Sequence, residues 1–299
     1  MIAVTILGNN SAIPAHDRHP TSQIVQTLEQ TFLVDCGEGT QMQMNRYKIR
    51  RKNLNHIFIS HLHGDHYFGL IGLITSFALN NRLQDLHVYS PPGLSEIIDM
   101  QLAVSSSKLP YNLIFHSLEK EGILWEDAHF SVRTFMVTHR IPCWGFLFQE
   151  KKYARKLNLD NIKKIKVPKS FYENLKKGED FICEDKVVKN KQLTFAAAPS
   201  KSYAYCADTI YDETICKKIL NVDMVYHEST YLHEEKIKAG ARFHSTSTQA
   251  ATIAHKAGAK RLLLGHFSSM YDNLETFREE ACGIFNNTEI ASEGACYIV

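Results

Sequence analysis

Residues 60–66, SHLHGDH, place three histidines and one aspartate within seven positions, directly after the apolar run LNHIFI. Neutral imidazole and carboxylate groups are ligands that zinc prefers in proteins. On a loop, His61 and His63 can both reach one metal ion, while Asp65 and His66 can turn toward a second ion nearby. Even with fifteen histidines in the chain, a chance HxHxDH is rare, so the segment predicts a metal site.

Three further candidate ligands follow apolar, strand-like runs later in the chain. His139 comes after FSVRTFMVT, Asp208 lies in YAYCADT, and His266 follows RLLLG. Taken singly, each could be an ordinary capping or hydrogen-bonded residue. Because α/β folds place ligands at the carboxyl tips of strands, their shared placement favours a common metal site. A site for two ions also needs a carboxylate able to bridge them.

The elements that would position these residues alternate along the chain. Strand-like runs recur in the first 150 residues: AVTILG, SQIVQTL, TFLVDCG, HIFIS, LHVYS, YNLIFHS, FSVRTFMVT and WGFLFQE. Helix-like stretches interrupt them at 66–79 and 93–105. Later come LTFAAAP, YAYCADT and DMVYHEST, a helix over 246–258 opened by Ser245/Thr246, the strand RLLLG and a helix over 274–285. The pattern predicts an α/β fold, with one domain over 1–299 and an insertion at 151–191.

The formal net charge of +2 hides an uneven distribution. Residues 151–191 hold thirteen Lys or Arg against six Asp or Glu, which leaves the remaining chain mildly acidic. Such a window suits a polyanion, because Lys and Arg gain affinity by neutralising phosphates. A solvated surface arm is the alternative, and charge alone does not decide between them. Tyr153, Phe171 and Tyr172 could stack on bases, but a small core within the arm is favoured.

Composition and cysteine usage indicate which classes of protein fit the sequence. Apolar residues make up 44% and charged residues 22%, a globular balance. The N-terminus MIAVTILGNNSAIP has no basic start, and the longest apolar stretch, 68–79, is too short for a bilayer. Seven scattered cysteines without a CxxC pair argue against a disulfide framework and a zinc ribbon. A cytoplasmic protein without a membrane span is therefore expected.

Seven motifs, in order, carry a resemblance to a known family: FLVDCGEGTQMQ, SHLHGDHYFGLIGL, THRIPCWGF, CADT, HEST, FHSTSTQAA and GHFSSMY. Their order resembles the metallo-β-lactamase superfamily and, within it, ribonuclease Z of the short bacterial form. The resemblance implies an αββα sandwich of two mixed sheets flanked by helices. It also implies that His61, His63 and His139 hold one zinc ion, that Asp65, His66 and His266 hold the other, and that Asp208 bridges them.

The same resemblance implies roles for other polar residues. His244 in FHST would be the general acid, oriented by Glu228 in HEST, while Asp65 would both ligate metal and accept a proton. Glu228 could instead be a strand-end carboxylate that caps a helix. Asp35 in VDCGEGT would orient a metal-bound histidine, or it could be a plain turn residue before Gly37.

The implied function is a zinc-dependent endoribonuclease that removes the 3′ trailer from precursor tRNA by metal-hydroxide attack. Two zinc ions per subunit, a homodimer and a flexible arm at 151–191 that grips the tRNA are implied with it. The chain departs from the family in having Lys169 and Ser170 after Pro168, where glycine and proline are usual, and Ala207 before Asp208. The alternatives are a same-fold hydrolase of small phosphodiesters or related esters, and a catalytically inactive RNA-binding scaffold.

Overall fold

A computed structural model describes residues 1–183 and 186–299 of the chain, which divide there into two compact units. The larger unit contains residues 1–125, 132–148 and 201–299, and the smaller unit contains residues 126–131 and 149–200. The expected insertion lies inside the smaller unit, which extends past it on both sides. The single domain with an inserted arm stays a prediction.

The first sheet runs from antiparallel to parallel pairing. Within the described residues it has seven strands in the order β18-β1-β2-β3-β4-β5-β6. Pairing is antiparallel from β18 to β3 and parallel from β3 to β6, so the sheet is mixed. The strands are β1 (Ala3–Gly8), β2 (Ser22–Gln26), β3 (Thr31–Cys36), β4 (Leu54–Phe58), β5 (Leu86–Ser90), β6 (Leu113–Ser117) and β18 (Cys296–Ile298).

The second sheet has the order β17-β16-β15-β14-β9-β8-β7, again seven strands among the residues described. Its strands are β7 (Gly122–Glu126), β8 (Phe130–Val137), β9 (Cys143–Glu150), β14 (Ser202–Cys206), β15 (Met224–Glu228), β16 (Leu262–Gly265) and β17 (Thr288–Ile290). Strands β14 to β17 are parallel. Because parallel strands end at one edge of a sheet, the residues that follow them gather there.

Aromatic side chains fill the space between the two sheets. Phe58 of β4 lies with its ring centroid 5.4 Å from that of Phe146 and 5.8 Å from that of Phe148, both on β9. Phe32 of β3 lies 5.7 Å from Phe148 in the same measure. All four side chains are fully buried, so each sheet contributes to one shared core.

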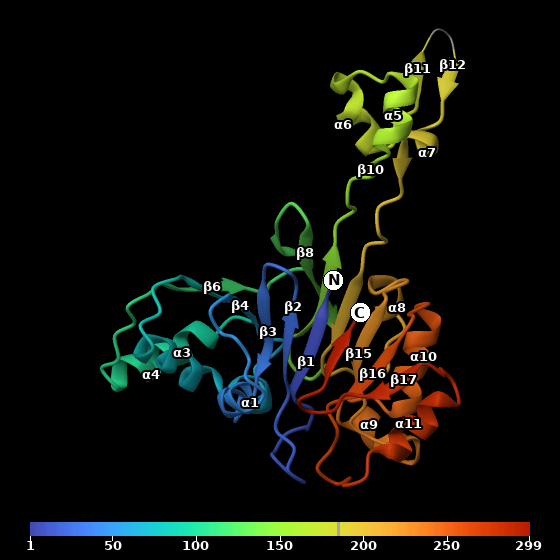
Figure 1. Cartoon of the computed structure of the whole chain (residues 1–299). Helices are drawn as coiled ribbons and strands as arrows, with labels where there is room; N and C mark the ends of the chain where they lie inside the picture. The colour runs from blue at the N-terminus through green and yellow to red at the C-terminus, as the bar shows by residue number, and fades with distance from the viewer. Residues whose placement is uncertain (184–185) are drawn as a thin grey trace. The chain divides into compact units, whose positions relative to one another are not determined.

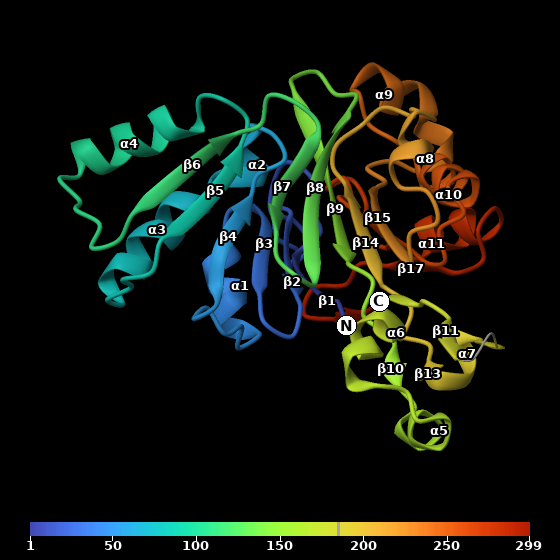
Figure 2. The ribbon, with the colours of Figure 1, turned by 90° about the horizontal axis from the view of Figure 1, so that it is seen from above.

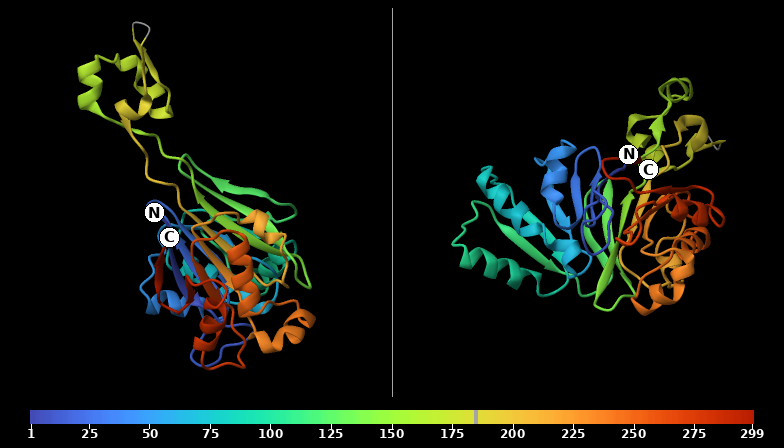
Figure 3. Two further views of the ribbon diagram at one scale, coloured as in Figure 1. Left: turned by 90° about the vertical axis from the view of Figure 1, so that its right-hand side faces the viewer. Right: turned by 90° about the horizontal axis from the view of Figure 1, so that it is seen from below.

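Helices cover the outer faces of the larger unit's sheets (Figures 2 and 3). The first sheet carries α1 (Thr40–Arg46), α3 (Leu70–Leu79) and α4 (Leu94–Val104). The second carries α8 (Ile215–Lys218), η2 (His233–Glu235), α9 (Lys236–Ala241), α10 (Ser247–Lys256) and α11 (Glu275–Cys282). The predicted αββα sandwich of two mixed sheets is confirmed. Every helix in 1–183 and 186–299 is too short or too polar to cross a bilayer.

The sequence prediction of one helix over 66–79 is wrong. The chain forms α2 (Gly64–Tyr67) and α3, separated at Phe68 and Gly69. There the Gly69 amide donates to the carbonyl of Cys36 at 2.9 Å, and a Cβ on Gly69 would lie 2.2 Å from the Gly37 carbonyl oxygen. This close approach of distant backbone excludes a side chain and breaks the helix.

Other predicted elements differ less. The LTFAAAP strand is reduced to β13 (Thr194–Phe195), because α7 (Asn190–Leu193) takes its first residue and no regular structure follows through residue 200. The helix over 246–258 is confirmed as α10, whose Thr246 side chain accepts from the Gln249 amide in a capping box. The helices at 93–105 and 274–285 are confirmed as α4 and α11.

The smaller unit consists of short helices and strands (Figure 1) and has a core of its own. Its elements are β10 (Lys156–Leu157), α5 (Leu159–Ile165), η1 (Lys169–Phe171), α6 (Tyr172–Lys177), β11 (Phe181–Cys183), β12 (Lys186–Val188), α7 and β13. The core consists of the buried residues Ile162, Val167, Leu175, Phe181 and Leu193. Phe171 and Tyr172 pack against this core, as favoured from the sequence, whereas Tyr153 is 38% exposed.

Candidate metal centre and catalytic site

The predicted ligands meet at the carboxyl ends of strands from both sheets. His61 and His63 lie on the loop after β4, and Asp65 and His66 lie on α2, which follows directly. The second sheet supplies the others from the loops that end its strands, with His139 after β8, Asp208 after β14 and His266 after β16. The structure therefore brings together all seven side chains that the sequence singled out as ligands.

A first group consists of His61, His63, His139 and Asp208, whose ligand atoms all lie within 4.8 Å of one another. His63 Nδ1 is 2.9 Å from His61 Nε2 and 3.2 Å from His139 Nε2. The Oδ2 atom of Asp208 is 3.5 Å from His61 Nε2. Nitrogen atoms this close can all reach one ion placed among them.

A second group consists of Asp65, His66 and His266, again with ligand atoms within 4.8 Å. Asp65 Oδ2 lies 3.3 Å from His266 Nε2 and 3.5 Å from His66 Nε2. The other oxygen of Asp208, Oδ1, faces this group, 3.2 Å from His266 Nε2 and 3.5 Å from His66 Nε2. Asp208 thus lies between the groups with one oxygen toward each, as a bridging carboxylate requires.

The buried polar atoms of these groups fit a divalent cation. Within the described part of the chain, His66 Nε2 and Asp208 Oδ1 are buried without a hydrogen-bond partner. Leaving such atoms unsatisfied costs free energy that a bound cation would offset. Burial, helped by the nearby His66, holds the pKa of the His61 imidazole well below its usual value. A neutral imidazole is the form that ligates metal.

Asp35 contacts the second group through His66 Nδ1, while His66 Nε2 faces the other ligands. This residue is the last but one of β3, has a left-handed conformation with φ of 55°, and is fully buried. Its Oδ2 accepts from His66 Nδ1 at 2.8 Å, and its Oδ1 accepts from the Ser60 amide at 2.7 Å. These contacts favour the orienting role over a plain turn residue, because they hold His66 with Nε2 facing the second group.

Glu228 contacts His244 directly and is linked to the second group through Thr230. It is fully buried at the end of β15, and its Oε1 accepts from His244 Nδ1 at 3.0 Å and from the Ser245 amide at 2.9 Å. Its Oε2 accepts from the Thr230 hydroxyl at 2.8 Å, and that hydroxyl lies 3.1 Å from His266 Nδ1. Since the Thr230 proton goes to Glu228, His266 must donate, which leaves its Nε2 free for metal.

The surroundings of His244 suit a proton donor. Burial lowers the pKa of this imidazole, but the carboxylates of Glu228, Asp208 and Asp65 together outweigh burial and raise the pKa to about 9. His244 also lies close to the metal groups, with its Nδ1 4.0 Å from Asp208 Oδ2. Because Glu228 binds Nδ1, the Nε2–H of a protonated ring remains available for donation.

The sequence analysis missed several groups that hold the site. Ser60 and Thr230 lie inside the quoted motifs SHLHGDH and HEST, so their place in these motifs was the available signal. The Phe243 carbonyl accepts from His139 Nδ1 at 2.9 Å, and the Ala12 amide donates to Asp65 Oδ2 at 2.8 Å. These last two are backbone groups. Because almost every residue carries the same backbone groups, residue types do not predict which of them contact the site.

Comparison with known proteins supports an assignment over nearly the whole chain. Residues 2–289 match the family model described as anti-Pycsar protein Apyc1. The chain therefore belongs to the family that this model describes. Ribonuclease Z of Bacteroides thetaiotaomicron is 42% identical over 297 residues, which cover 98% of this chain and 94% of the relative. Ribonuclease Z of Porphyromonas gingivalis strain W83 is 39% identical, over 97% of each chain.

Solved structures agree. The crystal structure of human tRNase Z, short form, matches with a TM-score of 0.72 and 25% identity, over 99% of this chain and 98% of that one. The metallo-β-lactamase fold protein YhfI from Bacillus subtilis, 18% identical, matches in fold with a TM-score of 0.70. With these relatives and a cluster of histidines and aspartates suited to divalent metal, the predicted enzyme class is confirmed. The chain is a metal-dependent hydrolytic endoribonuclease of the ribonuclease Z family, with the metallo-β-lactamase fold.

Proposed function

We propose that the chain is a zinc-dependent endoribonuclease that removes the 3′ trailer from precursor tRNA. Cleavage would leave a 3′-hydroxyl on the tRNA and a 5′-phosphate on the trailer. The observation that carries this proposal is Asp208, which lies between two groups of ligands at one sheet edge. The names of its relatives, ribonuclease Z and human tRNase Z, support RNA and tRNA as the substrate.

The proposed ligand sets follow the two groups. His61, His63 and His139 would hold one zinc ion, and Asp208 would bridge it to a second ion held by a separate set, Asp65, His66 and His266. When bound, zinc supplies Lewis acidity and lowers the pKa of water toward neutrality. The neutral His61 and the orphaned buried atoms His66 Nε2 and Asp208 Oδ1 support this arrangement.

Asp65 and His244 are the proposed proton carriers of the reaction. The Asp65 carboxylate accepts from the Ala12 amide at 2.8 Å and has its Oδ2 3.3 Å from His266 Nε2. As a carboxylate at the edge of the second group, Asp65 would accept a proton from the attacking water. His244, oriented by Glu228, would donate a proton to the departing ribose oxygen.

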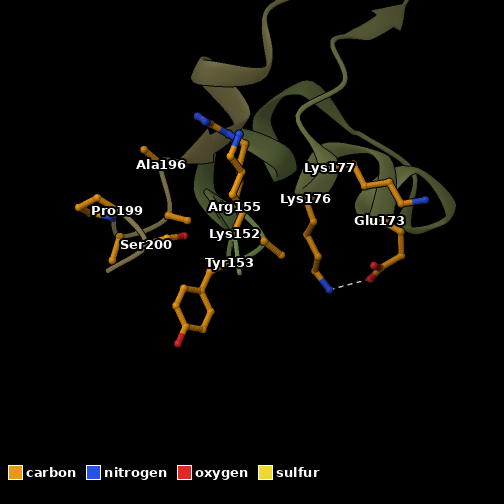
Figure 4. Close-up of a pocket in the computed structure, with 12 residues that line it drawn as sticks. Lys152, Tyr153, Arg155, Glu173, Lys176, Lys177, Ala196, Pro199 and Ser200 are labelled. Carbon is orange, nitrogen blue, oxygen red and sulfur yellow. Dashed lines mark hydrogen bonds and ion pairs between the residues drawn. The ribbon is translucent and has the colours of Figure 1, made fainter. Parts of the chain in front are cut away.

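The basic smaller unit, residues 151–191 above all, is the proposed binding site for the body of the tRNA. A groove of about 770 Å³ within this unit is lined by the basic side chains Lys152, Arg155, Lys176 and Lys177 (Figure 4). Glu173 pairs with Lys176 at 2.7 Å, so the other three cations are the candidates for phosphate contacts. Tyr153, which is 38% exposed and stacks on His129 at a centroid distance of 5.9 Å, also lines the groove and would extend this stack to a base.

A homodimer is the proposed oligomeric state. Leu79 of α3 is 83% exposed, while Met100 and Val104 of α4 are 68% and 84% exposed. Leu79 also lines a groove of about 410 Å³ together with Leu109. Large apolar side chains gathered on a protein surface commonly mark an interface, which supports pairing through α3 and α4.

Incubation of the zinc-loaded protein with a precursor tRNA that bears a 3′ trailer tests the proposed function. We expect one cut after the acceptor stem, a 3′-hydroxyl on the tRNA and about two zinc ions per chain. A same-fold hydrolase would split a nitrophenyl phosphodiester and leave the tRNA intact. An inactive scaffold would bind RNA without cutting it, and either outcome would contradict the proposal.

A further inference from the structure

We propose that Tyr205 and Ser60, joined through Asp35, form a brace that orients one histidine in each of the two metal groups. Asp35 and these two hydroxyls are called the Asp35 brace below. The proposal rests on the proposed function, because it assumes that both groups bind an ion. It adds Tyr205 and Ser60 as positioning residues, and neither of them would touch metal or substrate.

The Asp35 carboxylate is saturated by its neighbours. Among the described residues it accepts four hydrogen bonds, with Oδ1 bound by the Ser60 amide at 2.7 Å. Its Oδ2 is bound by the Ser60 hydroxyl at 2.9 Å, by His66 Nδ1 at 2.8 Å and by the Tyr205 hydroxyl at 2.6 Å. A carboxylate offers about four acceptor sites. All these groups are buried, so protein contacts alone determine the orientation of Asp35.

One branch of the brace reaches each metal group. His66, in the second group, donates to Asp35 directly. His61, in the first group, has its Nδ1 3.1 Å from the Ser60 hydroxyl oxygen. A hydroxyl has a single proton, and Ser60 donates that proton to Asp35. His61 Nδ1 must therefore carry the proton of its ring, which leaves the Nε2 lone pair directed at the first group.

Tyr205 holds the brace from the opposite sheet. It lies on β14, and its ring stacks on that of Tyr226 at a centroid distance of 5.1 Å, so the hydroxyl has a well-defined position. Asp35 lies on β3 of the first sheet and has a left-handed φ of 55°, a conformation that costs aspartate less than most residues but is still rarer for it than the extended one. The Tyr205 hydroxyl therefore helps to retain an Asp35 conformation that local preference would not.

Removal of the Tyr205 hydroxyl should lower the zinc affinity of both groups of ligands. In Tyr205→Phe, Asp35 keeps Ser60 and His66 but loses its contact with the second sheet. We expect zinc affinity to fall about tenfold at each group, the lower end of the range for residues that support a ligand. In Ser60→Ala, the link to His61 is lost, whereas His66 loses only its 3.2 Å contact with the Ser60 hydroxyl and keeps Asp35, so affinity should fall mainly at the first group.

Tyr203 provides a matched control on the same strand and the same face. It is as buried as Tyr205, but its hydroxyl donates to Gln23 rather than to Asp35. Tyr203→Phe therefore reports the general cost of losing a buried tyrosine hydroxyl in this core. The brace predicts wild-type zinc affinities for Tyr203→Phe, together with thermal stability of the zinc-free protein similar to that of Tyr205→Phe.

The experiment is a titration of zinc-free protein with Zn²⁺ in competition with a chromophoric chelator, with thermal unfolding measured alongside. We expect two zinc ions in the wild type, both bound more weakly in Tyr205→Phe, and one weakened in Ser60→Ala. A Tyr205→Phe titration that matches Tyr203→Phe, or that changes only one affinity, would overturn the brace. A wild-type stoichiometry of one would contradict the proposed two-zinc centre and, with it, a brace that serves two groups.

Discussion

Two buried carboxylates, Asp35 and Glu228, support the same cluster of histidines from different sheets. Asp35 accepts from His66 directly and is linked to His61 through the Ser60 hydroxyl. Glu228 repeats this scheme, since it accepts from His244 directly and is linked to His266 through the Thr230 hydroxyl. In each case a hydroxyl beside a strand end donates to the carboxylate and accepts from a histidine, which determines the tautomer of that histidine.

The difference lies in what each carboxylate supports. Both histidines on the Asp35 side are proposed ligands, and the Tyr205 hydroxyl donates a hydrogen bond to Asp35 at 2.6 Å. On the Glu228 side only His266 is a proposed ligand, whereas His244 is the proposed proton donor. Where Asp35 accepts from a tyrosine hydroxyl, Glu228 accepts hydrogen bonds from the backbone amides of Thr209, Thr230 and Ser245. The same arrangement of a carboxylate, a hydroxyl and two histidines can thus orient two proposed metal ligands around Asp35. Around Glu228 it can orient one proposed metal ligand and the proposed proton donor.

Replacement of the carboxylate between the two groups should have the largest effect. Asp208→Ala should abolish turnover and lower the metal content, because two dications would then lie close together without an anionic side chain between them. Metal analysis and rates on precursor tRNA check this result. A variant that keeps two zinc ions and a near-normal rate would refute the bridging role.

His244→Ala should separate the proton donor from the ligands. We expect turnover of precursor tRNA to fall by about a hundredfold or more with the metal content unchanged, the scale for loss of a positioned acid. A nitrophenyl phosphodiester has a good leaving group and should be hydrolysed almost normally. His255→Ala, at the exposed end of α10, is the control. Equal losses on both substrates would exclude the general-acid role.

Charge removal in the smaller unit should leave both carboxylate networks intact. Changing Lys152, Arg155 and Lys177 of the groove to Gln should weaken precursor tRNA binding about tenfold or more and reduce the slope of log K against log salt by up to about 3. Hydrolysis of a nitrophenyl phosphodiester should be unchanged. The control removes the same charge from α5 and its end, at Lys163, Lys164 and Lys166. Equal effects of the two triple variants would mean that general charge, not the groove, binds the tRNA.

Thr230→Val should produce the smallest change and test the comparison directly. The variant removes the link from Glu228 to His266, while the direct contact between Glu228 and His244 remains. Zinc affinity should therefore fall by several-fold to about tenfold at the second group alone. Competition titration measures this, with Thr248→Val on α10 as the control. Loss at both groups would show that the Glu228 side does not act separately from the Asp35 side.

The sequence alone determined the ligand types and the strand ends that carry them. His61, His63, Asp65 and His66 lie together directly after a strand, as the spacing indicated, and the Thr246 cap begins α10 where local chemistry indicated. These features depend on neighbours a few residues apart, so the local sequence contains the information they need.

Tertiary structure decided the contacts that join distant segments. The break at Gly69 depends on the backbone of Gly37, and the orientation of Asp35 depends on Tyr205, which lies 170 residues away in the chain. Likewise, only packing of the two sheets set one oxygen of Asp208 toward each metal group. Hydrogen bonds between distant residues depend on where the strands are placed, and local sequence preferences do not encode that placement.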